Sequence, residues 1–211
     1  MKRGFQLLSA LLIVIGLTVS ANAAQISGFG NPLTDAALAG GTQIDFEGET
    51  LGTYGAISVG DVTFTSLDNH LRIDNVYQGY NSTGYYLDNG TYDNNGFGNL
   101  DISFAGGTSA FGFNWSMAES FASWTLSAYD SASILLDTYA LPSTGPTSLG
   151  NYYGIGGVGA ISYATLSWNG AYDWISIDNF TYQASVPEPS ILLLLGSGLI
   201  GLGFVRRKFK A

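Results

Sequence analysis

Hydrophobic and polar side chains alternate along most of the chain between residues 24 and 185. The alternation is clear at residues 62–65 and 100–104. It places every second side chain on one face of an extended strand. Gly, Asn, Asp and Pro interrupt it about every 8–12 residues, as expected for turns between short strands. No stretch of ten or more residues has a helical period. The predicted strands cover residues 44–47, 62–65, 71–74, 100–104, 111–115, 124–128, 134–140, 161–168 and 174–182.

This pattern predicts an all-β domain. Half-buried strands joined by short turns, in a chain of this length, are typical of a two-sheet antiparallel β-sandwich of jelly-roll type. A closed barrel is the alternative. The predicted domain spans residues 24–185, which is enough chain to bury a core without disulfides.

Two stretches break the alternation and are predicted to be long surface loops. Residues 77–99 are dense in Gly, Asn, Asp and Tyr, with a short strand expected at 85–87, and residues 142–159 are dense in Gly, Ser and Thr. Loops often carry binding residues, and a tyrosine ring can stack on a sugar while its hydroxyl forms a hydrogen bond. The candidate glycan-binding residues are therefore Tyr85, Tyr86, Tyr152 and Tyr153. Alternatively, these tyrosines anchor the loops.

The amino-terminal end has the layout of a signal peptide. Lys2 and Arg3 precede an apolar run at residues 7–19, and Ala21-Asn22-Ala23 forms a small-residue cleavage site. The pattern predicts that residues 1–23 are removed after Ala23 by a signal peptidase.

The carboxyl-terminal end, residues 186–210, has three parts in a fixed order. Pro187-Glu188-Pro189 comes first, an uncharged apolar segment at residues 190–205 follows, and a basic cluster closes the chain. A helix over the apolar segment would be roughly 24 Å long, slightly short of the ~30 Å hydrocarbon core. The basic cluster would remain on the cytoplasmic side. Its residues include Arg206, Arg207 and Lys208.

This tail resembles the PEP-CTERM sorting signal of Gram-negative bacteria, which is also classified as an ice-binding protein C-terminal domain. The resemblance implies a transmembrane helix that an exosortase processes near Pro187-Glu188-Pro189. An ordinary membrane anchor is the alternative. The stretches 44–66, 108–116, 124–141, 151–157 and 175–183 are similar to the passenger domains of exported proteins with this tail. That likeness implies a β-sandwich related in form to carbohydrate-binding jelly rolls.

Charge excludes one class of partner. The chain has seven Lys and Arg residues, and six of them lie in the two terminal segments. Between residues 24 and 185 only Arg72 remains, against fifteen acidic residues (all sixteen except Glu188), so the net charge there is near −14. Phosphates would be repelled, which excludes nucleic-acid binding. The chain has no cysteine, which removes thiol catalysis and the usual zinc sites.

The acidic surface would attract divalent cations. Asp45 and Glu47 are two residues apart and are predicted to share one face of the first strand. The resemblance to carbohydrate-binding jelly rolls implies that Asp178, on the last strand, completes a structural calcium site of oxygen ligands. The alternative is that these are solvated charges and an Asx turn.

The sequence therefore predicts a non-enzymatic protein, exported to the cell envelope or to the extracellular polysaccharide matrix, with a structural or weak glycan-binding role. The alternative is a secreted glycan-active hydrolase or lyase. Such an enzyme needs two carboxylates at a set separation across a cleft, and fifteen acidic residues make pairs of that kind by chance. Ice binding, suggested only by the tail's second name, would need a flat face with regular threonines, for which Thr63 and Thr65 are too few.

Overall fold

The computed structural model describes residues 24–66, 69–76, 84–90, 99–118, 120, 122–145, 150–170 and 173–185. The predicted signal peptide and sorting tail lie outside these residues. The described chain forms twelve strands and one short 3₁₀ turn, η1 (Pro32–Thr34). The strands are β1 (Ala24–Phe29), β2 (Thr42–Ile44), β3 (Gly52–Tyr54), β4 (Ala56–Val59), β5 (Val62–Ser66), β6 (Leu71–Asp74), β7 (Tyr86–Asp88), β8 (Leu100–Ser116), β9 (Ala122–Tyr129), β10 (Leu135–Leu141), β11 (Asn151–Gly170) and β12 (Ser176–Ala184).

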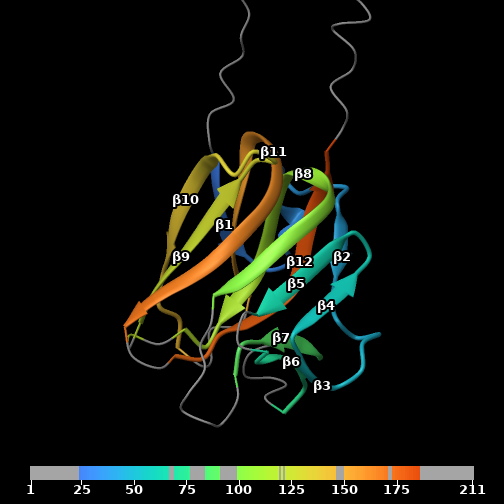
Figure 1. The fold of residues 1–211 in the computed structure, drawn as a ribbon, viewed down its shortest axis with the longest axis vertical. Coiled ribbons are helices and arrows are strands. Elements are labelled where there is room, and N and C mark those ends of the chain that lie inside the picture. The colour runs from blue at the N-terminus through green and yellow to red at the C-terminus, as the bar shows by residue number, and fades with distance from the viewer. Residues whose placement is uncertain are drawn as a thin grey trace, which may run out of the picture.

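The strands form two layers that share β8 and β11 (Figure 1). In the first layer the order is β10-β9-β11-β8-β5-β4, built from the second half of β11 and the first half of β8. In the second layer the other halves of β11 and β8 lie between β1 and β12, and β2 and β7 pair with β12. Strands β6 and β3 extend this layer beyond β7. All of these pairings are antiparallel.

Glycines let the two long strands pass from one layer to the other. Gly107 in β8 has φ 72°, and Gly157 and Gly159 in β11 have φ 69° and 96°. Residues with a Cβ rarely adopt this left-handed region. The β11–β8 register also shifts between Gly156 and Ile161. These residues define the bend end of the sandwich.

Aromatic side chains join the layers. Phe64 of β5 meets Phe180 of β12 edge to face, with ring centroids 5.1 Å apart. Trp115 and Trp124, on β8 and β9, are 5.7 Å apart in a similar arrangement. All four side chains are buried. Burying a large apolar side chain contributes about 1.5–3 kcal/mol, so this seam stabilises the sandwich without disulfides.

The prediction of an all-β antiparallel domain is confirmed. The predicted loop at residues 142–159 is wrong from residue 151 onward, because Asn151 starts β11. Its glycines serve close packing between strands: a Cβ on Gly154 would lie 2.0 Å from the carbonyl oxygen of Phe111. The strands predicted separately at 100–104 and 111–115 are both parts of β8.

The described residues contain no helix long and apolar enough to cross a membrane. The predicted transmembrane segment at residues 190–205 lies outside them.

Candidate functional site

The predicted calcium ligands do not assemble. No three His, Cys, Asp or Glu side chains of the described residues form a group that could hold a metal ion. Strand β2 ends at Ile44, so Asp45 and Glu47 lie in the turn after it, where Phe46 has φ 60°. Asp45 and Glu47 are exposed, whereas Asp178 is buried in β12.

All three carboxylates bind backbone amides instead, and Asp45 accepts a hydrogen bond from the N–H of Glu47 at 3.2 Å. Glu47 accepts a hydrogen bond from the N–H of Tyr85 at 2.8 Å, and Asp178 accepts one from Asn179 at 2.6 Å. Glu47 also lies directly over Gly84, where a Cβ would meet its carboxylate. The three residues do not fit a shared calcium site.

The four candidate tyrosines do not form one surface. Tyr86 is buried in β7, and Tyr152 is buried in β11, where its hydroxyl donates to Asp35 at 3.2 Å. Tyr85 and Tyr153 are half-buried and pack against the main core. Tyr153 meets Tyr139 edge to face at 5.9 Å, and burial raises the pKa of its hydroxyl. The rings of Tyr86 and Tyr152 are thus closed to a sugar.

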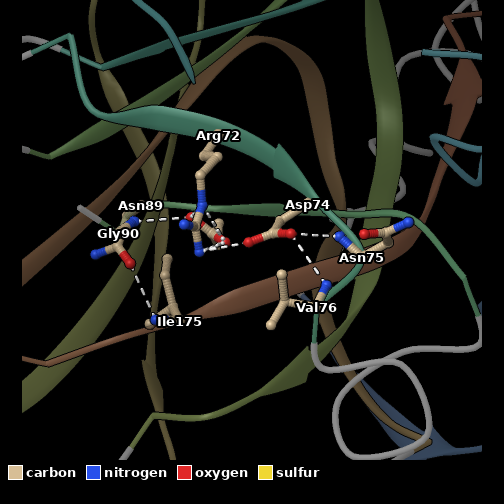
Figure 2. Close-up of polar contacts among 8 residues, drawn as sticks. Arg72, Asp74, Asn75, Val76, Asn89, Gly90 and Ile175 are labelled. Atoms are coloured by element: carbon tan, nitrogen blue, oxygen red, sulfur yellow. Dashed lines mark hydrogen bonds and ion pairs between the residues drawn. The ribbon is translucent and has the colours of Figure 1, made fainter. Parts of the chain in front are cut away.

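Arg72 organises a polar cluster at the β6–β7 edge (Figure 2). Its guanidinium lies 2.7 Å from a carboxylate oxygen of Asp74 and 2.9 Å from one of Asp88. A further hydrogen bond runs from Nε to Asp88 at 3.1 Å. Arg72 also lies over the ring of Trp174, 6.0 Å from its centroid. The single basic residue of the domain is thereby held between two carboxylates and an indole.

Besides Arg72, the two carboxylates of this cluster bind backbone amides. Asp74 accepts hydrogen bonds from the N–H groups of Asn75 and Val76, and Asp88 accepts one from Gly90 at 2.9 Å. Burial raises the pKa of Asp88 to about 6, although Arg72 and the Gly90 amide act in the opposite direction.

The neighbouring polar side chains extend the cluster toward β12 and β9. Asn89 accepts a hydrogen bond from the N–H of Ile175 at 3.0 Å, as Figure 2 shows. Asp173 accepts one from the indole N–H of Trp124 at 2.7 Å. We define the arginine cluster as Arg72, Asp74, Asp88, Asn89, Asp173 and Trp174. Its contacts tie β6 and β7 to the rest of the sandwich.

The outward surface of the first layer has a different character. Strand pairing aligns its side chains in two rows that run across six strands, and hydroxyl groups predominate in both. We call this surface the hydroxyl face. One row is Leu135, Tyr129, Tyr163, Ser103, Thr63 and Ser58; the other is Thr138, Ser127, Thr165, Asp101, Thr65 and Ala56.

A pair of tyrosines stands in the first row. Tyr129 and Tyr163 are stacked, with ring centroids 4.8 Å apart and ring planes inclined by 9°. Both are half-buried. On the side of Tyr163 away from Tyr129 the next residue in the row is Ser103, which is small and exposed. Directly opposed residues on antiparallel strands lie about 4.5–5.5 Å apart, so the tyrosine stack ends beside a low, polar ledge.

The ledge includes one carboxylate. Asp101 lies opposite Thr165 on one side and Thr65 on the other. Burial raises the pKa of its carboxyl group. The cross-strand pair Ser58 and Thr63, at the far end of the first row, shares a 2.8 Å hydrogen bond. The ledge therefore offers hydroxyl donors and acceptors and one carboxylate acceptor.

A shallow hollow of about 270 Å³ lies elsewhere, beside the turn that follows β2. Asp45 and Glu49 contribute to its wall together with Gly60 and Tyr182. Its lining residues come from β2, β4, β12 and the turns beside them, so it is separate from the tyrosine stack.

Tyr129 and Tyr163 were not among the predicted binding residues, because they lie in strands and the candidates were tyrosines in or beside predicted loops. The signal was present in the strands. Each tyrosine is next to a buried alanine, Ala128 or Ala164, so each occupies an outward position. An aromatic residue at an outward position is the pattern that would have pointed to this face.

Comparison with solved structures finds several chains of low identity to this one, including the following three. TmCBM61 in complex with β-1,4-galactotriose is 13% identical, with a TM-score of 0.34, over 59% of this chain and 88% of that one. The K1 cleaved adhesin domain of Lys-gingipain from Porphyromonas gingivalis W83 is 10% identical, with a TM-score of 0.41, over 77% and 99%. A point mutant of the family 29 carbohydrate-binding module CBM29-2 is 11% identical, with a TM-score of 0.32, over 79% and 99%.

No curated protein matches the chain. A family model described as the PEP-CTERM protein-sorting motif matches residues 185–208. The match includes Pro187, Glu188 and Pro189 and ends with the basic residues Arg206, Arg207 and Lys208. It confirms the sorting motif predicted for the tail and implies an exported protein that is processed at the membrane. The chain is a protein with a PEP-CTERM sorting motif.

Proposed function

We propose that this protein acts after export in the cell envelope or extracellular matrix of a Gram-negative bacterium, where it binds a glycan through the hydroxyl face without acting as an enzyme. The observation that carries the proposal is the stacked pair Tyr129 and Tyr163 next to the exposed Ser103. An aromatic ring beside a polar ledge suits a sugar, which has an apolar ring face and a rim of hydroxyl groups.

The register of the strands suggests where a sugar ring would lie. Placed against Tyr163 on the side away from Tyr129, it would continue the stack and lie above Ser103. Thr63 lies opposite Ser103 on β5, and Asp101 lies beside this position in the second row, on β8. Their oxygens would accept hydrogen bonds from sugar hydroxyls. The rows run across six strands, so a chain of several sugars would fit along them.

Charge narrows the class of glycan. Arg72 is the only Lys or Arg between residues 24 and 185, and it is held by Asp74 and Asp88 on β6 and β7, outside the hydroxyl face. An anionic polysaccharide would meet repulsion from an acidic domain and no cationic partner on this face. We therefore propose an uncharged glycan as the ligand.

The state of the carboxylates supports binding over catalysis. A glycosidase needs one acid of raised pKa that reaches the substrate. Asp88 has a raised pKa, but it is buried and its oxygens are engaged by Arg72 and Gly90. Asp101 also has a raised pKa and is open to the hydroxyl face, but the two rows of this face contain no second carboxylate to act as its partner.

Binding of the exported protein to immobilised polysaccharides tests the proposal. We expect retention on a neutral glucan, mannan or galactan, and none on alginate at low salt. Tyr163→Ala should weaken retention about tenfold, equivalent to about 1.4 kcal/mol. The matched control is Tyr54→Ala, since Tyr54 is a half-buried tyrosine on β3, outside the first layer. Absence of binding to all neutral glycans, or an equal loss in both variants, would contradict the proposal; release of reducing sugar would indicate an enzyme.

A further inference from the structure

The folded domain holds the chain up to the point where the sorting motif begins. Strand β12 ends at Ala184, which pairs with Thr108 of β8. The next residue, Ser185, donates its backbone N–H to the carbonyl of Gly107 at 3.3 Å and its hydroxyl to the carbonyl of Gly106 at 2.6 Å. The Thr108 hydroxyl donates to the carbonyl of Gln183. We call these contacts the terminal clasp.

Very little chain separates the clasp from the motif. The family match starts at residue 185, the residue that the clasp holds. An extended chain spans at most about 3.3–3.6 Å per residue. Pro187 and Pro189 are two and four residues beyond Ser185, so they lie within roughly 7 Å and 14 Å of it. The covalent chain therefore limits how far Pro187-Glu188-Pro189 can be from the bend end.

The other end of the domain leaves from the same place. Ala24, where β1 begins, pairs with Gly156, which adjoins the bend of β11. Figure 1 shows the first residues of β1 and the last residues of β12 at the same end of the sandwich. A signal peptide and a sorting tail, both in the membrane before processing, would thus hold the bend end against the membrane surface.

We propose that the terminal clasp limits access of the membrane processing enzyme to the sorting motif. The enzyme reaches Pro187-Glu188-Pro189 only when it approaches the bend end closely and the last residues of the domain detach from Gly106–Thr108. The folded domain thereby controls the rate of its own processing. The proposal concerns access alone and is independent of glycan binding.

The bend end suits such an approach. Ala105, Gly106 and Ala160 are small and exposed, so a protein at the membrane surface would meet little side-chain bulk there. Detachment is also local. It breaks the Ser185 and Thr108 contacts and leaves the paired body of β12 in place.

Two variants test whether the clasp limits access of the processing enzyme to the motif. A six-residue Gly-Ser spacer between Ser185 and Val186 moves Pro187-Glu188-Pro189 away from the clasp and leaves the clasp contacts unchanged. The pair Thr108→Val and Ser185→Ala removes both side-chain hydrogen bonds without adding length. Each lost hydrogen bond weakens the clasp by a factor of roughly five. The matched control is the same spacer between Ala132 and Ser133, in the exposed turn that joins β9 and β10.

The measurement is a pulse-chase of the full chain in cells that produce the exosortase, with the melting temperature of each purified variant as a check on folding. We expect the terminal spacer and the clasp variant each to process at least about threefold faster, and the turn insertion to process at the unaltered rate. An unchanged or slower rate with the terminal spacer overturns the proposal. Faster processing with the spacer but not with the clasp variant overturns the role assigned to the clasp. Glycan retention of the same variants should be unchanged, so the two proposals fail separately.

Discussion

The arginine cluster and the hydroxyl face are two regions of the described residues where polar side chains gather, and they differ in where their partners lie. In the arginine cluster, Arg72, Asp74 and Asp88 satisfy one another and the neighbouring amides. On the hydroxyl face, Ser103 and Thr138 point outward and are exposed. The first region is closed by the protein itself, and the second is open to another molecule.

This difference shows that a perturbed, buried charge does not by itself mark a functional site. The pKa of Asp88 is raised to about 6, yet its contacts hold strands together. Strained ionisable groups occur in structural networks as well as in active sites. The open face has weaker electrostatic signals and better geometry for a ligand. Predictions that separate stability from binding test the contrast directly.

The largest expected effect is on the arginine cluster. Arg72→Met would leave Asp88 buried without its cation, and breaking a buried pair by removing one partner costs about 3–5 kcal/mol. We expect a loss of that size in the free energy of unfolding, measured by urea denaturation. Ser103→Ala, on the hydroxyl face, should change it by less than about 0.5 kcal/mol. Similar losses in both variants would erase the distinction between the two regions.

A second prediction concerns pH. The pKa of Asp88 rises from its ordinary 3.8 to about 6 in the folded protein, so the folded state binds this proton more tightly than the unfolded chain does. Protonation therefore favours folding. The free energy of unfolding should fall by about 2 kcal/mol as the pH rises from roughly 4 to above 6.

Asp88→Asn identifies the residue responsible for that slope. Burial also raises the pKa of Asp101, which acts in the same direction, so a residual slope should remain in the variant. Urea denaturation of both proteins at a series of pH values makes the comparison. Stability that instead rises with pH through this window would show that Arg72 outweighs burial at Asp88.

A third prediction concerns binding alone. Ser103→Leu would fill the space beside Tyr163 where the sugar is proposed to lie, and we expect about tenfold weaker glycan retention, equivalent to about 1.4 kcal/mol. Stability should barely change, because Ser103 is exposed. The control is Ser123→Leu, on the same face but opposite Asn169 at the far end of β9. An equal loss of glycan retention in both variants would show that the glycan has no defined position on the hydroxyl face.

The sequence was sufficient for the fold class because strand alternation reports burial directly. Phe64 and Ile102 are buried between polar neighbours, as the pattern requires. The glycines of β11 led to the wrong prediction of a loop at residues 151–159, since glycine occurs both in turns and where strands pack closely. Gly154 packs against β8 with no room for a Cβ, and that contact depends on a partner about forty residues away, which local pattern cannot reveal.

The candidate site was harder to predict for a related reason. Tyr129 and Tyr163 belong to different strands, and only the β9–β11 register places them together. Tyr152, by contrast, was selected for its surroundings in sequence and is buried over Gly28. Arg72 was recognised as the only basic residue of the domain, but its partners were not. Cross-strand neighbours depend on the order and register of the strands. The sequence predicted the fold class but neither of these.

The smallest expected effect is that of calcium on stability. It tests whether the three predicted calcium ligands are already occupied by contacts within the protein, as the carboxylates of the arginine cluster are. Asp45, Glu47 and Asp178 were predicted to share a calcium ion, yet Glu47 and Asp178 bind the amides of Tyr85 and Asn179, and Asp45 accepts a hydrogen bond from Glu47 at 3.2 Å. Calcium would have to displace these contacts and draw a buried and two exposed carboxylates together. Millimolar calcium or a chelator should therefore shift the melting temperature by less than about 1 °C, equivalent to a few tenths of a kcal/mol. A larger rise with calcium, abolished in Asp178→Asn, would restore the calcium site and show that the described arrangement changes on metal binding.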